Sequence, residues 1–196
     1  MKAYAAAGDA LSEGDLEGAI RLLEWAKSAA ARSAAVREAL GVTRYHAQDF
    51  AGAQSELLAY RRLSGRHDQN HLLADCARAL GRPEKVAEYV DAMDPAVVPA
   101  DRIAEGIIVL AGERADRGDL DGALRTLERA DLAPAEVAAH HVRLWYLAAD
   151  LSERAGEPEA ARDYLEAISA VDPDYLDVEE RLEALDRGEA PPPAEG

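Results

Sequence analysis

The chain contains 196 residues and carries a formal net charge of −16 at pH 7, from 38 acidic and 22 basic residues. This charge disfavours binding to phosphate backbones and to anionic membranes, and it favours basic or mixed-charge partners. Hydrophobic residues make up 48% of the chain but aromatic residues only 5%, so much of the apolar content is alanine. Alanine builds helices that approach one another closely, and the composition is therefore typical of a helical protein.

Cysteine content and the length of apolar runs bear on the compartment. Cys76 is the single cysteine, so no intramolecular disulfide can form, which fits a reducing compartment. The first residues begin like a secretory leader, but Asp9 and Glu13 interrupt it before an adequate apolar run can form. No segment reaches the roughly 18 consecutive apolar residues that a membrane helix requires. The sequence therefore predicts a soluble, cytoplasmic protein.

A short phrase returns about every 34 residues. Its first copy is Gly-Asp-Leu-x-x-Ala, and related copies occupy residues 14–19, 48–53, 81–86, 118–123 and 156–161. A fixed period of this size indicates a repeat solenoid, in which each unit packs on its neighbours. Such solenoids generally bind other molecules and seldom catalyse reactions.

The chemistry of the phrase predicts a helical hairpin around each copy. Its glycine can take the left-handed conformation that a helix C-terminus prefers, and its aspartate can cap the next helix. Pro83 and Pro158 suit the first turn of a helix, where an N–H would be unpaired anyway. In four copies the phrase ends on a small residue that lets the two helices cross closely: Ala19, Ala53, Ala123 and Ala161. The residue at this position of the third copy, Val86, is larger.

In chain order, the sequence predicts a repeat domain over residues 1–186. Its five hairpins span about 1–30, 34–63, 68–92, 102–131 and 136–171. Two prolines in the connection 92–99 predict a loop there, and residues 92–101 should be the least regular part of the array. A capping helix is expected at about 175–185, with Leu176, Val178, Leu182 and Leu185 on its apolar side. Residues 187–196 lack apolar periodicity, and we expect a disordered, proline-rich tail.

These residues resemble the tetratricopeptide repeat (TPR) family. The resemblance is carried by Leu40-Gly41, by Gly14-Asp15-Leu16-x-x-Ala19 and by Asp172-Pro173, and it covers nearly all of residues 1–186. Residues 36–41, 61–65 and 74–84 are similar to a group of small actinobacterial TPR proteins, a resemblance that bears on the fold alone. Membership in the family implies an all-α, right-handed superhelical solenoid, with a concave groove lined by the first helix of each hairpin.

By that implied geometry, a set of first-helix residues should face the groove and bind a protein or peptide partner. Aromatic rings beside charged groups suit an extended peptide, because they combine apolar area with orienting polar contacts. The alternative is that these are ordinary solvated helix residues. The set is Tyr4, Glu38, Tyr45, His46, His71, Asp75, Arg78, Tyr146, Asp150 and Glu153.

The best-known peptide-binding mode of the family is a clamp for a terminal carboxylate, built from Lys, Asn and Arg on successive first helices. Here the matching helices offer Glu38 and Val42, then Asp68 and Leu72. Acidic side chains would repel a carboxylate, so this mode is excluded.

Two other chemistries have weaker support. His67, His71 and Asp75 fall at i, i+4 and i+8, which could bring three metal ligands to one helix face, but a plain polar helix face is the favoured interpretation. His140 and His141 should point in different directions, which argues against a shared ion. Cys76 sits in an apolar stretch and is expected in the core, and a nucleophilic role would require a base such as His46.

Further residues on apolar faces are expected to be structural. Trp25, Trp145 and Tyr164 fall on apolar stripes and are predicted to lie in the core. The acids near the C-terminus lack the spacing of a calcium loop, so a solvated capping face is expected there. The first helix has no preceding repeat to cover it, and its alanines could bind a second copy of the chain. These alanines are Ala3, Ala6, Ala7 and Ala10.

The sequence therefore predicts a non-enzymatic scaffold that binds a protein or peptide in the groove, with no cofactor. A self-associating module is the alternative. A metal protein using His67, His71 and Asp75 is the least favoured hypothesis.

Overall fold

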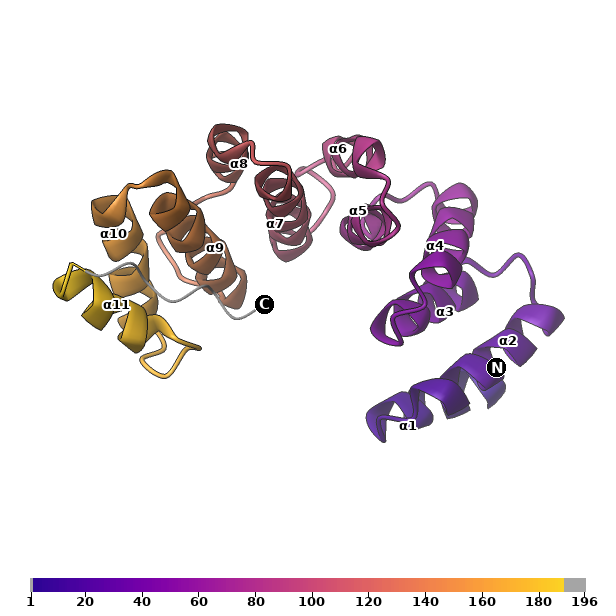
Figure 1. The fold of residues 1–196 in the computed structure, drawn as a ribbon. Coiled ribbons are helices and arrows are strands. Elements are labelled where there is room, and N and C mark those ends of the chain that lie inside the picture. The colour runs from indigo at the N-terminus through magenta and orange to yellow at the C-terminus, as the bar shows by residue number, and fades with distance from the viewer. Residues whose placement is uncertain (1, 189–196) are drawn as a thin grey trace. The chain divides into compact units, whose positions relative to one another are not determined.

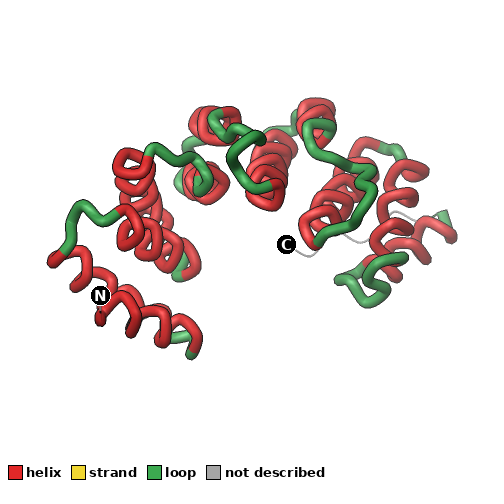
Figure 2. Tube along the Cα trace, turned by 180° about the vertical axis from the view of Figure 1, so that it is seen from behind, coloured by secondary structure: helices red, strands yellow, loops and turns green. Residues whose placement is uncertain are grey.

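The computed structural model describes residues 2–188, and within this range the chain forms eleven α-helices and no strand. Figures 1 and 2 show the helices and their connecting loops. None of the helices in the described range has the length and apolar content needed to span a bilayer. The helices are α1 (Lys2–Ser12), α2 (Leu16–Ala29), α3 (Ala34–His46), α4 (Phe50–Ser64), α5 (Asn70–Ala79), α6 (Pro83–Asp91), α7 (Ala100–Asp116), α8 (Leu120–Leu127), α9 (Ala139–Ala155), α10 (Pro158–Ser169) and α11 (Val178–Asp186).

The helices belong to two compact units, and the division falls within α7, between Gly106 and Ile107. In unit 1, the pairs α1–α2, α3–α4 and α5–α6 pack as hairpins, and successive hairpins touch through α2 with α3 and α4 with α5. In unit 2, α9 and α10 form a hairpin, which α8 contacts through α9 and α11 contacts through α10. Each unit is thus a stack of neighbouring helices.

The turns of the recurring phrase have the predicted chemistry. Glycines in the phrase take positive φ angles, from 66° at Gly81 to 81° at Gly118, and Gln48 takes the same conformation with φ 59°. Three aspartates cap the following helix by accepting a backbone N–H bond at 2.8–2.9 Å: Asp15 from Gly18, Asp49 from Gly52 and Asp119 from Gly122. Pro83 and Pro158 occupy the first turns of α6 and α10. These predictions are confirmed.

The aspartate cap also requires a glycine three residues after the aspartate, and this glycine was not predicted from the sequence. A Cβ atom at Gly18 would lie 1.9 Å from the Asp15 carboxylate. Gly52 and Gly122 have the same relation to their capping aspartates. The two proline turns have no aspartate cap, and the matching positions are Lys85 and Ala160. The glycine therefore occurs in the three turns that have an aspartate cap and not in the two proline turns.

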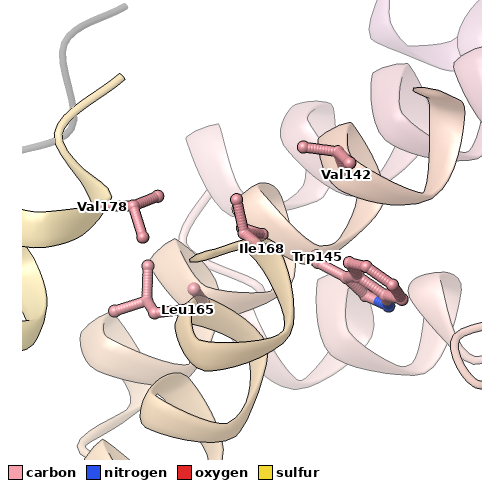
Figure 3. Close-up of a cluster of buried hydrophobic side chains, with 6 residues drawn as sticks. Val142, Trp145, Leu165, Ile168 and Val178 are labelled. Carbon is pink, nitrogen blue, oxygen red and sulfur yellow. The ribbon is translucent and has the colours of Figure 1, made fainter. Parts of the chain in front are cut away.

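The apolar core lies between the helices of each hairpin. All five residues that end the phrase, the four alanines and Val86, are fully buried. In unit 2, a cluster joins α9, α10 and α11 through Val142, Trp145, Leu165, Ile168 and Val178 (Figure 3). The indole N–H of Trp145 donates to the Leu132 carbonyl at 2.9 Å. The core assignment of Trp145 is confirmed.

Trp25 contradicts its predicted core position. Its side chain is 63% exposed on α2, whereas Leu23 and Ala26 of the same helix are buried. Successive helical residues are about 100° apart, so a residue two positions after Leu23 points to nearly the opposite side. The prediction was wrong because α2 buries the face of Leu23 rather than that of Trp25.

Several element ends differ from the predicted ranges. Helix α8 ends at Leu127, and a turn in which Asp131 accepts from the Ala133 N–H separates it from α9. Helix α11 begins at Val178 rather than at the predicted residue 175, because Leu176 has a left-handed φ of 45°, which is incompatible with a right-handed helix. Most of the predicted tail, residues 189–196, lies outside the described part of the chain.

Candidate functional site

In unit 1, a tyrosine and an aspartate join two successive first helices. The Tyr45 hydroxyl of α3 donates to Asp75 Oδ2 of α5 at 2.6 Å. Burial, together with this hydrogen bond, raises the pKa of Tyr45 well above its usual range, so the phenol stays protonated. The Tyr45 ring meets the rings of His46 and Phe50 edge-on, with centroids 5.6 and 6.0 Å away. The ring is therefore held in one orientation.

Exposed polar side chains surround this pair. Arg78 Nη1 lies 3.9 Å from Asp75 Oδ1, and the Arg78 side chain is 41% exposed. Asp75 itself is 25% exposed, and His46 is exposed at the end of α3. Tyr4 is also exposed, on α1. We call Tyr45, His46, Asp75 and Arg78 the unit 1 face, because the structure brings these four predicted residues together.

The remaining predicted residues of unit 1 lie closer to the protein interior. Glu38 accepts from Gln69 Nε2 at 2.7 Å, which ties α3 to the start of α5. His71 is largely buried, and burial followed by the charge of Arg102 lowers its pKa to about 4. Neutral His71 is thus a packing residue at neutral pH.

A buried carboxylate, which the prediction treated only as a repulsive clamp residue, holds the corner between α4 and α5. Asp68 accepts from the Tyr60 hydroxyl at 2.8 Å and from Arg102 Nη1 at 3.0 Å, and it also pairs with Arg66. Burial and the Asp68 bond raise the pKa of Tyr60 to about 12. Its burial and its partners show that Asp68 has a structural role.

Unit 2 has a similar tyrosine–aspartate contact, but the chain itself covers it. The Tyr146 hydroxyl of α9 donates to Asp177 Oδ1, just before α11, at 2.8 Å. Arg181 of α11 lies over the Tyr146 ring, with its guanidinium carbon 5.0 Å from the centroid. Arg181 Nη2 and Nε donate to the two oxygens of Glu153 at 2.6 and 3.3 Å.

The ion pair between Arg181 and Glu153 in unit 2 is buried. The side chains of Arg181 and Glu153 are 0% and 8% exposed. Burial raises the pKa of Glu153 although Arg181 opposes the shift. Burial and the Asp177 bond raise the pKa of Tyr146 to about 12. We call Tyr146, Glu153, Asp177 and Arg181 the unit 2 joint. The expectation that Glu153 faces an open groove was wrong, because α11 covers it.

Asp150, the third predicted residue of unit 2, pairs with Arg154 one turn along α9, at 3.2 Å. Arg181 and Asp177 were not predicted as site residues. Arg181 falls at i+3 from Val178 and i−4 from Leu185, and this position of an arginine within an apolar stripe was the signal.

The metal and nucleophile hypotheses receive no geometric support. His67 precedes α5 and approaches Asn70, and Asp75 is bonded to Tyr45, so the three predicted ligands serve different contacts. No group of three or more His, Cys, Asp or Glu residues within 2–188 could hold a metal ion. Cys76 is fully buried, as predicted, and burial raises the pKa of its thiol to about 12, which keeps it protonated.

Two smaller expectations change. The rings of His140 and His141 lie side by side, with centroids 4.1 Å apart, rather than pointing apart. His141 Nδ1 accepts from the Ala138 N–H at 2.8 Å, so this ring is engaged at the start of α9. On α1, Ala3 and Ala7 are buried in contacts with α2 and α3. The predicted alanine stripe is therefore largely covered within unit 1.

Solved structures define the fold class. No family model and no curated protein matches the chain. TTC0263, a thermophilic TPR protein of Thermus thermophilus, is 15% identical with a TM-score of 0.65, and the match covers 95% of this chain and 98% of that one. PilF of Pseudomonas aeruginosa is 14% identical with a TM-score of 0.64, over 91% and 78% of the two chains.

YrrB, described as a TPR protein with an unusual peptide-binding site, is 18% identical with a TM-score of 0.59, over 88% of this chain and 86% of that one. At these identities the likeness concerns the fold. The chain has the fold of a tetratricopeptide-repeat solenoid, which confirms the resemblance drawn from its motifs.

Proposed function

We propose that this chain is a non-enzymatic scaffold that binds a protein partner, as an extended peptide, on the unit 1 face. The observation that carries the proposal is the Tyr45–Asp75 hydrogen bond of 2.6 Å, which fixes an aromatic ring beside the exposed side chains of His46 and Arg78. A pre-oriented ring loses little conformational freedom when a partner binds. TPR folds generally serve as protein-interaction scaffolds, and YrrB is a TPR protein with a peptide-binding site, which supports the proposal by analogy of fold.

The charges of the face indicate what it binds. Asp75 and Arg78 present both signs within 3.9 Å of each other, so a partner segment with both signs can pair with them. The chain as a whole carries −16, which attracts a basic segment over a longer range. A single, buried cysteine fits a reducing compartment, and we infer that binding takes place in the cytoplasm.

Quantitative affinity purification from a lysate of the source organism tests this function. The test variant is His46→Ala/Arg78→Ala, which alters exposed side chains and leaves the Tyr45–Asp75 bond in place. The matched control is Arg62→Ala, an exposed arginine on the second helix of the same hairpin. We expect the test variant to lose partners that the wild type and the control retain. Identical partner sets for all three proteins would contradict the assignment of the face.

A second candidate function is self-association through the first hairpin. The observation that favours it is Trp25, which lies 63% exposed on α2, with Tyr4 and Leu11 also exposed on the same hairpin. A contiguous exposed apolar patch is typical of an interface, and this candidate requires that the three side chains form one. Light scattering at high micromolar concentration should then show a dimer that Trp25→Ala dissociates, and a monomeric wild type excludes this candidate.

A further inference from the structure

Helix α11 is attached to unit 2 by apolar contacts along one of its faces and by an exposed ion pair of 2.8 Å between Asp186 and Arg162 of α10. Val178 is fully buried and faces Leu165 and Ile168 of α10 (Figure 3), and Ala184 is also buried. The opposite side of α11, at Glu179, Glu180 and Glu183, is exposed to solvent. With nine residues, α11 is too short to be stable as an isolated helix in water. Packing on α9 and α10 therefore decides whether it is formed.

The position of α11 is fixed by a buried ion pair. Arg181 donates twice to Glu153 and lies over the Tyr146 ring, which defines where the helix sits. Such a pair selects one geometry but contributes little net free energy, because both charges lose their hydration. In addition, Arg181 Nη1 is buried without a hydrogen-bond partner among residues 2–188, and its nearest carboxylate oxygen, Asp177 Oδ1, lies 3.9 Å away. The Arg181–Glu153 contact therefore fixes where α11 sits but contributes little to the free energy that holds it there.

The segment before α11 favours release. Leu176 holds a left-handed φ of 45°, a strained conformation for a residue with a branched side chain, and it is exposed. Release of α11 relaxes this residue and returns Arg181 and Glu153 to water. It would uncover one continuous surface on α9 and α10, formed by Tyr146, Glu153, Leu165 and Ile168.

We propose that α11 is a releasable cover, and that the surface beneath it binds an amphipathic helix of a partner protein that carries an arginine. The resident helix shows the pattern that fits: an apolar residue at i, arginine at i+3 and a small residue at i+6, as in Val178, Arg181 and Ala184. Glu153 and the Tyr146 ring select the arginine, and Leu165 and Ile168 select the apolar residue. This helix-binding site belongs to unit 2 and is independent of the peptide site proposed on unit 1.

A labelled peptide of residues 174–188 probes the surface, and fluorescence anisotropy measures its binding to the full chain. The resident α11 competes with the peptide, so Arg181→Ala in the chain should tighten peptide binding by about tenfold or more, by raising the uncovered fraction. Arg187→Ala, which removes an exposed arginine from the end of the same helix, should bind the peptide like the wild type. A peptide with alanine in place of Arg181 should lose most of the affinity. Equal binding to the wild type and to Arg181→Ala overturns the proposal.

Hydrogen exchange on the unaltered chain gives a second test that does not depend on the folding of a variant. The amides of α11 should exchange about 100-fold faster than those in the centre of α9, because α11 opens alone. Equal protection in the two helices means that α11 opens only when unit 2 unfolds, and this result also overturns the proposal.

Discussion

The two units share a tyrosine–aspartate hydrogen bond, but the residues around it are exposed to different degrees. In each unit, the hydroxyl of a tyrosine on a first helix donates to an aspartate two helices further along the chain. Tyr45 of α3 donates to Asp75 of α5 at 2.6 Å, and Tyr146 of α9 donates to Asp177, just before α11, at 2.8 Å. In unit 2, a fully buried arginine covers the tyrosine ring, whereas the aspartate of unit 1 remains 25% exposed. The tyrosine–aspartate contact thus positions a ring in both units, and the covering helix of unit 2 buries the carboxylate beside the ring, whereas the carboxylate beside the ring of unit 1 stays partly exposed.

Removal of a buried carboxylate should have a different effect in each unit. Asp68→Ala leaves the Tyr60 hydroxyl and two arginines without their acceptor inside unit 1, and we expect a loss of about 2–3 kcal/mol in unfolding free energy. Glu153→Ala leaves Arg181 with only the more distant carboxylate of Asp177, and α11 can release the arginine into water, so the loss in unit 2 should be smaller. Urea denaturation measures both. A larger loss for Glu153→Ala would show that α11 is an integral part of the fold.

Acidification should destabilise unit 1 through His71. Its folded pKa of about 4 lies below the usual histidine value, because burial and Arg102 disfavour the charged ring. The unfolded chain therefore binds the proton more readily, and stability falls as the pH drops from about 6.5 towards 4, by about 1–2 kcal/mol at pH 5. In denaturation curves at pH 7 and pH 5, His71→Gln should lose less stability than the wild type. His46→Gln, at an exposed position, should lose as much stability between pH 7 and pH 5 as the wild type does.

The turns differ within the chain as well, and a smaller effect should separate them. Gly18→Ala places a Cβ against the Asp15 cap, so the carboxylate must shift and the cap weakens, at a cost of about 1 kcal/mol. Lys85→Ala, at the matching position of a proline turn, has no cap to disturb and should change stability by less than about 0.5 kcal/mol. Thermal denaturation of the two variants measures the difference, and equal effects would contradict the role given to the glycine.

The repeat architecture could be predicted from the sequence because its signals are local. A glycine that ends a helix, an aspartate that caps the next one and a buried alanine one turn later all lie within six residues, as in Gly14, Asp15 and Ala19. The first-helix residues Tyr45 and Asp75 could be placed near one another for the same reason, since the period fixes the spacing of successive helices.

Contacts that depend on which face a helix buries could not be predicted. Trp25 lies on an apolar stripe of α2, and only the packing shows that α2 buries the face of Leu23 instead. Arg181 was overlooked because a buried charge needs a partner, and Glu153 lies 28 residues away. The capping helix was therefore expected from the sequence, but its buried contact with Glu153 emerged only from the structure.

Carboxylate footprinting with a carbodiimide and an amine, read by mass spectrometry, tests the contrast between the two units most directly. In the wild type, Asp75 should be labelled several times faster than Glu153, because α11 shields Glu153. In Arg181→Ala, the labelling of Glu153 should rise towards that of Asp75, while Asp75 is unchanged. Equal labelling of both carboxylates in the wild type, or a Glu153 that stays protected in Arg181→Ala, would contradict the account.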